Sequence, residues 1–263
     1  MQKVFESLST AFRMHEGILT QSEYERILEE DTEILEDAQT LFFLLQASGY
    51  PIEECESGYR LSSYFTPYEK QRYCIIDIET NGSQPLTSQV IEIGAIMIEN
   101  GKEIQRFESF VECAFLPEYI SRITGIQPSD LIDAPSRKEA LTALRHFMGD
   151  AIFVAHNADF DYGFLNASFD RFGLGQIGNP KLCTIELARR TFESERYGLA
   201  HLIDFLGIET ATHHRALSDA FCASKVMEKS FANLPSYVAS ADELLAFATS
   251  SRKDRRLKKE RLA

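Results

Sequence analysis

The stretch YCIIDIET at residues 73–80 decides the fold of the larger part of this chain. Its three isoleucines and its flanking apolar residues form the continuous run of a strand buried in a sheet. Side chains alternate between the two faces of a strand, so Asp77 and Glu79 point to the same side. Two carboxylates on a buried strand lose hydration and repel each other. A bound metal cation removes both costs; the alternative is a strand end at which both acids reach water.

Strands and helices alternate after this stretch. Further apolar runs predict strands over residues 90–98, 104–111 and 151–155. Helical periodicity covers residues 117–123, 136–148, 158–172, 183–192, 198–206 and 214–231. Three consecutive strands, followed by helices and one more strand, predict an α/β fold with a mixed sheet and helices packed on it. Glu92, a buried-looking acid in the second strand with no partner nearby in sequence, is interpreted as structural.

The residues before this sheet are expected to form a small, mainly helical domain. Helical periodicity covers residues 3–14, 21–30 and 32–48, and strands of a short hairpin are expected at 50–52 and 58–61. Thr20 and Glu23 have the spacing of a capping box before the second helix. Three helices and a hairpin favour a winged helix, a module that docks nucleic acid or protein. The alternative is a helical cap or a partner-docking module.

Charge divides the chain and limits its partners. The 263 residues include 27 basic and 40 acidic ones, a net charge of −13. Residues 1–72 carry six basic and fourteen acidic residues, whereas residues 252–263 carry seven basic and two acidic ones. Such a balance argues against nonspecific coating of duplex DNA through a broad basic surface. The basic end is interpreted as a solvated tail, with a role in holding nucleic acid as the alternative.

Composition and boundaries predict three parts and a cytoplasmic protein. We expect an N-terminal domain at 1–70, a main domain at 71–235, and a helical and basic C-terminal tail at 236–263. The five cysteines are scattered and form no Cys-x-x-Cys pair, which argues against a disulfide framework or a thiolate zinc site and favours a reducing cytoplasm. We expect no secretory signal and no membrane partner, because the longest apolar run is far too short to span a bilayer.

Two further stretches place acids and histidines beside the predicted sheet. HNADFD at residues 156–161 follows a strand and opens a helix, so it lies at one end of the sheet. Taken alone, Asp161 could be an acid favoured in the first turn of a helix, and Asp159 is an acid of the same type. His156 is interpreted as a hydrogen-bonded structural histidine.

The last stretch is HHRALSDA at residues 213–220, at the start of a long helix. His214 and Asp219 are five residues apart, so they share a face only if His214 lies in the loop before the helix. A loop histidine can titrate near neutral pH, as a general base must. Each of these stretches could be incidental when taken alone, and their combination is the informative feature.

Together the three stretches resemble the DEDDh exonucleases, a family with a ribonuclease-H-like domain that includes the epsilon proofreading subunit of bacterial DNA polymerase III. The family's motifs are matched by DIET at 77–80, HNADFD at 156–161 and HRALSDA at 214–220. The segments ITGI at 123–126, DAP at 133–135 and YGLAHL at 197–202 are also similar to the family. The resemblance covers about residues 70–235, with all motifs in order.

The resemblance implies a site and a reaction. It implies that two divalent cations are held by Asp77, Glu79, Asp161 and Asp219. Oxygen ligands favour Mg²⁺ or Mn²⁺ over zinc, and two such ions can serve the hydrolysis of a phosphodiester. The resemblance makes His214 the general base that takes a proton from the attacking water. It also suggests that the terminal nucleotide or its phosphate contacts Thr80, Asn157 and Phe160.

We therefore expect a metal-dependent 3′–5′ exonuclease that acts on the single-stranded 3′ end of DNA and releases 5′-mononucleotides in proofreading or repair. The same chemistry on RNA is the alternative within the family, and a non-catalytic nucleic-acid-binding or polymerase-binding scaffold is the alternative of another class. About 70 residues precede the nuclease motifs, unlike in the epsilon subunit, and they are candidates for binding a DNA polymerase subunit or another repair protein. The Gly-rich run at 173–178 matches a dinucleotide fingerprint, but it follows a predicted helix and is interpreted as a turn.

Overall fold

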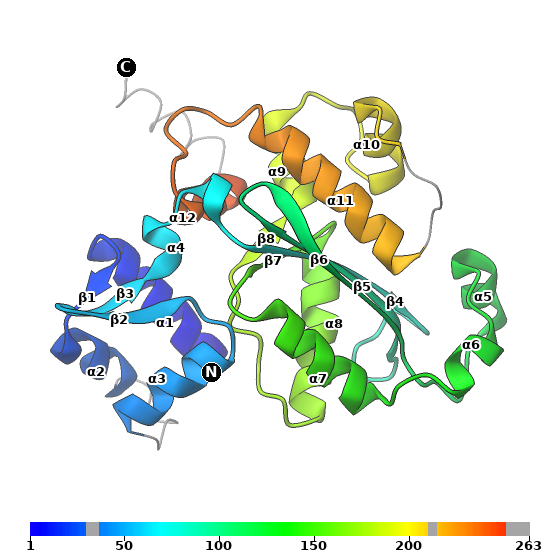
Figure 1. Ribbon diagram of the computed structural model, residues 1–263, viewed down its shortest axis with the longest axis horizontal. Helices are drawn as coiled ribbons and strands as arrows, with labels where there is room; N and C mark the ends of the chain where they lie inside the picture. Colours follow the sequence, from blue (N-terminus) through cyan, green and yellow to red (C-terminus); the bar gives the residue numbers. More distant parts are fainter. Residues whose placement is uncertain (30–36, 210–214, 251–263) are drawn as a thin grey trace.

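The computed structural model of this protein describes residues 1–29, 37–209 and 215–250. Two bodies of secondary structure follow one another along the chain and lie side by side (Figure 1). Each has its own buried apolar core: one is built from residues 4–61, and the other surrounds a five-stranded sheet. The expected division into a small N-terminal part and a larger α/β part agrees with these two cores, while its boundaries stay a prediction.

The N-terminal unit, built on the core of residues 4–61, combines helices with a small antiparallel sheet of strand order β1-β3-β2. Its first elements are α1 (Gln2–Met14), β1 (Ile18–Leu19), α2 (Gln21–Glu29), α3 (Ala38–Ala47), β2 (Ile52–Cys55) and β3 (Gly58–Leu61). The expected capping box is present: the Thr20 amide donates to Glu23 Oε2 at 2.8 Å, and the Glu23 amide donates to Thr20 Oγ1 at 3.3 Å. This mainly helical composition is as expected, and its assignment as a winged helix stays a prediction.

Two expected boundaries in this unit are wrong. The helix expected over 32–48 begins at Ala38, because Asp37 has extended backbone angles and its side chain accepts the Thr40 amide as an N-cap; residues 32–36 lie outside the described part. The first hairpin strand is Ile52–Cys55 instead of 50–52. Pro51 has no amide hydrogen for a ladder, and Tyr50 is buried against Phe5.

The larger part contains a mixed sheet of order β6-β5-β4-β7-β8. A short helix α4 (Ser62–Phe65) and a 3-10 turn η1 (Tyr68–Lys70) lead into it. Its strands are β4 (Tyr73–Thr80), β5 (Val90–Glu99), β6 (Lys102–Phe110), β7 (Ile152–Ala155) and β8 (Lys181–Cys183). β4, β5 and β6 are antiparallel neighbours, whereas β7 and β8 run parallel to β4. The four expected strands are confirmed, and β8 is an addition.

Helices cover both faces of this sheet. They are α5 (Glu118–Thr124), α6 (Pro128–Ile132), α7 (Arg137–Met148), α8 (Ala158–Arg171), α9 (Thr184–Thr191), α10 (Leu199–Leu206), α11 (Ala216–Phe231) and α12 (Ala241–Thr249). Side chains of α7 and α8 pack with Cys74, Ile76 and Ile78 on one face. Those of α9, α11 and α12 pack with Tyr73 and Ile75 on the other. The pair α5–α6 projects beyond one end of the sheet (Figure 1).

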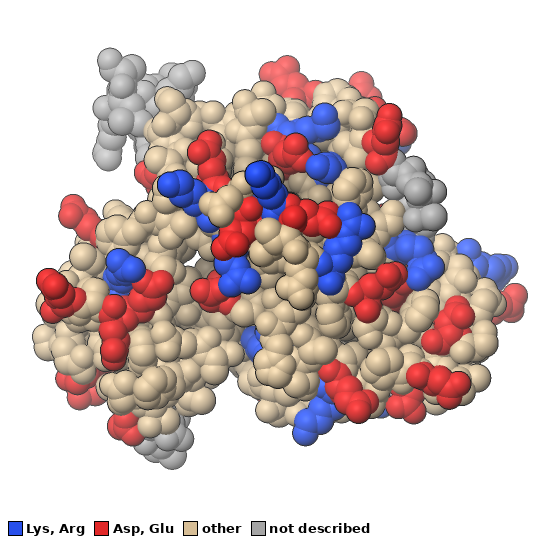
Figure 2. Space-filling view, in the orientation of Figure 1, with Lys and Arg blue, Asp and Glu red and all other residues tan. Residues whose placement is uncertain are grey.

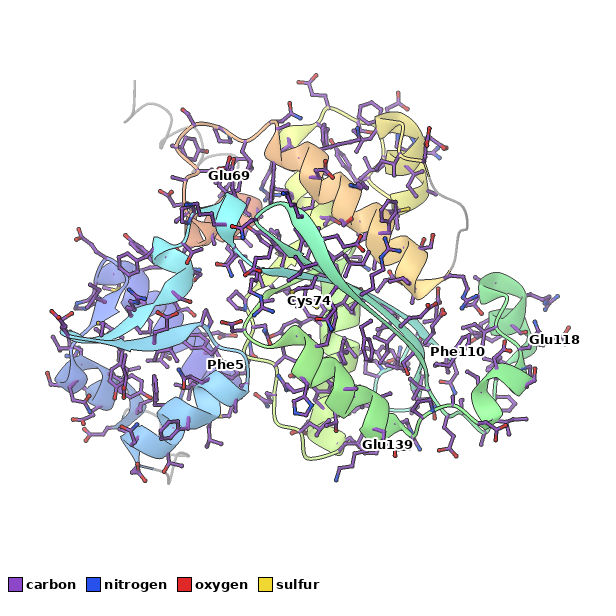
Figure 3. The ribbon with its side chains drawn as sticks, in the orientation of Figure 1. Phe5, Glu69, Cys74, Phe110, Glu118 and Glu139 are labelled. Carbon is purple, nitrogen blue, oxygen red and sulfur yellow. The ribbon has the colours of Figure 1, made fainter. Side chains whose placement is uncertain are left out.

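The N-terminal unit is docked on the larger part through specific contacts. Phe5, labelled in Figure 3, lies at the seam and packs closely on Gly178, where a Cβ would lie 3.0 Å from the Phe5 ring. The Gly178 amide donates to Ser48 O at 2.7 Å. The Gly-rich run at 173–178 is therefore a loop that receives the N-terminal unit, which agrees with its interpretation as a turn.

The surface has mixed charge. Figure 2 shows acidic side chains across the N-terminal unit and basic ones interspersed with acidic ones on the larger part, without a continuous basic surface among the described residues of this face. In the described part of the chain, no helix is both long enough and apolar enough to cross a membrane.

Candidate active site

Strand β4 presents two carboxylates on one face of the sheet. Asp77 and Glu79 alternate with Ile76 and Ile78, whose side chains are buried under α7 and α8 on the opposite face. In the ladder with β5, Asp77 lies opposite Gly94 and Glu79 lies opposite Glu92. The period-two prediction that the two acids share a face is confirmed.

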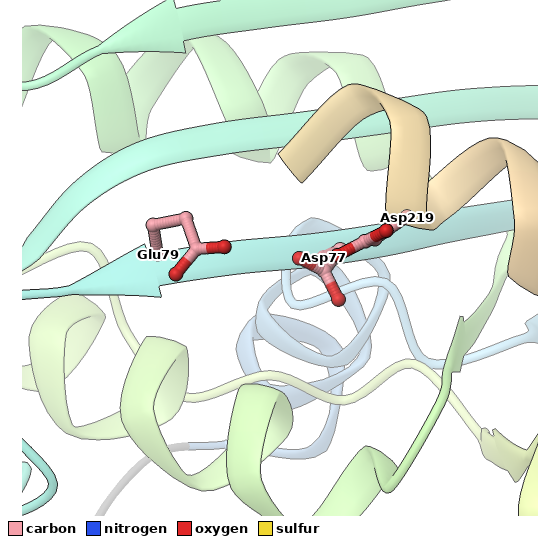
Figure 4. Close-up of side chains that lie close together, drawn as sticks. All are labelled: Asp77, Glu79 and Asp219. Carbon is pink, nitrogen blue, oxygen red and sulfur yellow. The ribbon is translucent and has the colours of Figure 1, made fainter. Parts of the chain in front are cut away.

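Helix α11 brings the third carboxylate to this face. One oxygen from each of Asp77, Glu79 and Asp219 can be chosen so that all lie within 4.8 Å of one another. We call these three residues the carboxylate cluster (Figure 4). Asp219 lies in the first turn of α11, and its amide donates to Arg215 O at 2.9 Å. Residues 142 positions apart in sequence thus meet at a single point.

Asp161 approaches the same point from the other side of the strand. It is buried in the first turn of α8, and its Oδ1 accepts the amide of Ile78 at 3.2 Å. The parallel pairing of β4 with β7 extends only to Ile75 and Val154, so the Ile78 amide lies beyond the end of β7. Asp161 therefore satisfies a backbone donor that the shorter neighbouring strand leaves open, and it lies next to the cluster without belonging to it.

The electrostatics of these acids are unfavourable without a cation. Burial, with the nearby Asp161, Asp219 and Glu79 carboxylates, raises the pKa of Asp77 well above its ordinary value. Burial and the neighbouring Glu92 and Asp219 raise the pKa of Glu79 to about 7. Burial also raises the pKa of Asp161 to about 7, although the Ile78 amide opposes this shift. Such mutual repulsion is what a bound divalent cation relieves.

The donor set fits a hard divalent cation. Every candidate ligand atom in the cluster is a carboxylate oxygen, and such ligands suit Mg²⁺, Mn²⁺ or Ca²⁺ more than soft metals. The arrangement can therefore hold a divalent cation at the face of β4, where a phosphate group could reach it.

The three expected substrate contacts have different surroundings. Thr80 is buried and donates its hydroxyl to Gly82 O at 2.8 Å, so it stabilises the turn after β4. Asn157 is exposed, with a left-handed backbone (φ 70°) at the start of α8. Phe160 is 37% exposed and packs its ring against Phe164 with centroids 5.4 Å apart. Asn157 and Phe160 are available at the surface beside Asp161.

Of the two histidines singled out in the sequence, His156 can be compared with the structure and His214 cannot. His156 Nδ1 pairs with Thr184 Oγ1 at 2.8 Å, and burial lowers the pKa of His156 to about 4, so this ring is neutral and structural, as expected. His214 lies outside the described residues. The helix after it begins at Ala216 with Arg215 as N-cap, so His214 precedes the helix, which is the condition for its predicted role.

Two residues of the site are less evident from sequence. Glu92 was recognised as a structural acid, and its partners are Arg215 and the Ala216 amide. Gly94 was overlooked: a Cβ there would lie 2.1 Å from the Leu217 amide nitrogen, so only glycine lets α11 approach β5 this closely. An isolated glycine inside an apolar strand was the available signal, because it often marks a close backbone approach.

Comparison with known proteins agrees with this geometry. A family model described as Exonuclease matches residues 74–227. DNA polymerase III PolC-type from Staphylococcus aureus strain MW2, like that of strain bovine RF122 / ET3-1, is 38% identical over 160 residues. The match covers 60% of this chain and 11% of the relative, so the chain corresponds to a small part of those proteins.

Solved structures share the fold at low identity. Escherichia coli exonuclease I in complex with a dT13 oligonucleotide has a TM-score of 0.54 and 18% identity, over 60% of this chain and 40% of that chain. The zinc-bound E. coli ExoI–ssDNA complex has a TM-score of 0.58 and 18% identity, over 64% and 42%.

These findings confirm the family and the ribonuclease-H-like fold expected from the motifs. The family match includes the strand with Asp77 and Glu79 as well as the helices with Asp161 and Asp219. Because it covers more than half of the chain, this protein belongs to the exonuclease family, as an enzyme of the DEDDh 3′–5′ type.

Proposed function

We propose that this protein hydrolyses DNA from a single-stranded 3′ end, releasing 5′-mononucleotides, in proofreading or repair. The observation that carries the proposal is the meeting of Asp77, Glu79 and Asp219 on one face of β4, with Asp161 beside them. The relatives named as DNA polymerase III and the DNA-bound exonuclease I structures support DNA as the substrate class.

The four carboxylates would hold two divalent cations, Mg²⁺ or Mn²⁺. Such ions, when bound, activate a water molecule and stabilise the attacking and leaving oxygens of a phosphodiester. The protein contributes the arrangement: Asp77 and Glu79 are fixed by the ladder of β4 with β5, and Asp219 is fixed by the first turn of α11. Asp161 is fixed by its bond to the Ile78 amide.

The remaining roles belong to residues beside the cluster. His214 would accept the proton of the attacking water, a role that histidine side chains commonly serve near neutral pH. Phe160 would stack on the terminal base, because its ring is partly exposed and supported from behind by Phe164. Asn157 and the turn held by Thr80 would contact the terminal nucleotide or its phosphate.

The test uses single-stranded DNA and RNA oligonucleotides labelled at the 5′ end, with Mg²⁺ or Mn²⁺. A ladder that shortens by one nucleotide at a time from the 3′ end, and that EDTA abolishes, is the expected result. Asp77→Ala should remove it. Asp159→Ala is the matched control, because Asp159 is in the same motif as Asp161 but is exposed and paired with Lys181.

The outcomes separate the alternatives. No cleavage of either substrate would refute the proposal and favour a binding scaffold. Faster degradation of RNA than of DNA would move the enzyme to the exoribonuclease alternative. A ladder that survives Asp77→Ala would show that the activity arises at another site.

We also propose that residues 1–70 bind a protein, such as a polymerase subunit or another repair protein, and not DNA. Helix α3 contains neither Lys nor Arg and exposes Phe43 by 59% and Leu44 by 44%. Apolar side chains on an acidic unit suit a protein surface better than a phosphate backbone. A double variant Phe43→Ser and Leu44→Ser should weaken binding to a purified polymerase subunit, while Met14→Ser, also exposed, should not.

A further inference from the structure

Glu92 is an acid in an environment where an unpaired carboxylate would be strongly destabilising. It lies on β5, an interior strand of the sheet between β6 and β4, and has no exposed surface. Its Oε1 accepts Nε of Arg215 at 2.9 Å and Nη2 at 2.7 Å, and its Oε2 accepts the amide of Ala216 at 3.1 Å. Both oxygens are therefore occupied by the two residues at the beginning of α11.

These bonds replace a conventional helix cap. Arg215 is the N-cap residue of α11, and its own side chain makes no capping bond to the helix. The carboxylate of Glu92 instead accepts the first helical amide and places a negative charge at the positive end of the helix. The start of α11 is thus attached to the sheet by a charge-assisted pair and not by a local turn.

Other groups hold Arg215 from the adjacent strand. Its guanidinium lies over the ring of Phe110, 5.3 Å from the centroid, and 3.7 Å from Glu108 Oε1; Phe110 is labelled in Figure 3. Two residues along β5 from Glu92, Gly94 leaves the space in which Ala216 and Leu217 approach the strand. Arg215 is consequently fixed by β5 and β6 together.

The attachment is one hydrogen bond away from the carboxylate cluster. The carbonyl of Arg215 accepts the amide of Asp219 at 2.9 Å. Arg215 therefore contacts Glu92 through its side chain and Asp219 through its backbone. On the other strand, Glu92 lies opposite Glu79 in the ladder. His214 is the residue before Arg215 in the chain.

We propose that Glu92 and Arg215 are positioning residues of the exonuclease site, which set the place of Asp219 relative to Asp77 and Glu79. The expected effect on catalysis rests on the proposed function. The expected effect on metal binding rests only on the geometry of the carboxylate cluster. Groups that orient metal ligands in this way typically change metal affinity or activity by about 10- to 100-fold when they are altered.

Two conservative variants break the attachment with little change in shape. In Glu92→Gln, the amide offers an acceptor on one side only, so either Arg215 or the Ala216 amide faces an NH₂ group. In Arg215→Lys, one ammonium replaces the two-pronged contact. Glu103→Gln and Arg106→Lys are the matched controls, because they alter an exposed Arg–Glu pair of the same sheet, on β6.

The measurements are the Mn²⁺ dissociation constant by electron paramagnetic resonance, kcat and KM on a labelled oligonucleotide, and circular dichroism at the assay temperature. We expect Glu92→Gln and Arg215→Lys to weaken Mn²⁺ binding or to lower kcat by about 10- to 100-fold, with KM for the oligonucleotide little changed. The double variant should be no worse than the more damaging single one, because both break the same connection. The controls should behave like the wild type.

Folded variants with wild-type Mn²⁺ affinity and wild-type kcat would overturn the inference. So would a double variant whose losses are the product of the single ones. If Glu92→Gln does not fold, Arg215→Lys alone decides by the same criteria. If the wild type shows no exonuclease activity, the proposed function fails, whereas the Mn²⁺ measurement still tests the positioning role.

Discussion

Asp77 lies directly opposite Gly94 in the antiparallel ladder of β4 and β5. The absence of a side chain at Gly94 lets the first turn of α11 rest on the sheet at this level, and that turn contains Asp219. The glycine opposite Asp77 is therefore the place where α11 comes close enough to the sheet to bring Asp219 to Asp77.

Gly94→Ala should therefore lower activity more than a strand substitution elsewhere. The new Cβ would meet backbone atoms of Ala216 and Leu217 at 2.1–2.4 Å, and backbone cannot give way as a side chain can. We expect kcat to fall by about tenfold or more and unfolding free energy to fall by about 1–3 kcal/mol. Gly163→Ala, inside α8 with open space around it, is the control and should be neutral or stabilising. An active, stable Gly94→Ala enzyme would show that α11 does not need this approach.

Replacing His214 tests the proton acceptor. His214→Ala should reduce kcat by about 10²- to 10⁴-fold, the usual contribution of a general base, while Mn²⁺ affinity stays near that of the wild type. The adjacent His213→Ala is a matched control and should retain activity. Equal losses of metal affinity and kcat in His214→Ala would contradict a role as base alone.

The stability of the metal-free protein should decrease as the pH rises, and a bound metal should oppose this decrease. The pKa values of Glu79 and Asp161 are raised to about 7, so the metal-free folded protein binds protons more tightly than the unfolded chain. Stability from these groups is present at low pH and is lost as the pH rises through about 7. In EDTA, Tm should therefore contain a component that decreases from about pH 4.5, near the ordinary pKa of a glutamate, to about pH 7, and levels off above it.

Mn²⁺ should then raise Tm more at pH 8 than at pH 6, because the cation binds the ionised carboxylates. Differential scanning fluorimetry with EDTA or Mn²⁺ at each pH measures this difference. In Asp77→Asn the gain at pH 8 should be smaller. Equal gains at both pH values would show that these acids do not titrate in this range.

An ion pair between Arg13 and Asp242 joins the two bodies at their seam. Arg13 donates from Nε and Nη2 to both oxygens of Asp242, whose side chain is only 7% exposed. Arg13→Ala would leave a buried carboxylate without this partner and should lower the unfolding free energy by about 1–3 kcal/mol in urea titrations. Arg26→Ala, an exposed substitution on α2, should have little effect. Unchanged stability in Arg13→Ala would show that the seam is held elsewhere.

Sequence reasoning predicted the parts of the site that depend on local patterns. The alternation along 73–80 is enough to place Asp77 and Glu79 together, and the position of 156–161 after a strand is enough to place Asp161 at the end of the sheet. The family resemblance was needed to connect Asp219 with them, because nothing local relates α11 to β4. Neither source predicted that Asp161 would bond the amide of Ile78, since that depends on where β7 stops.

Two strands that the sequence did not predict, β8 and β1, owe their stability to distant partners. Strand β8 has three residues and exists through its pairing with β7, and β1 has two residues paired with β3. Their lengths are too short for any periodic pattern to appear. The start of α3 was misplaced because the helical period of the sequence extends to residues before Asp37, whereas the helix begins after Asp37, whose side chain caps it.

Helix α12 determines how long a fragment of this protein must be to bury its own core. The family match ends at residue 227, yet Leu244, Leu245 and Phe247 of α12 pack in the same buried cluster as Tyr73 and Ile75. The segment that leads into β4 also meets the start of α12, since the Ala241 amide donates to Thr66 O and the Tyr68 amide donates to Ala239 O. A fragment limited to residues 74–227 would expose an apolar face of its own sheet. The segment that matches the family model is therefore shorter than the segment that can bury its own core.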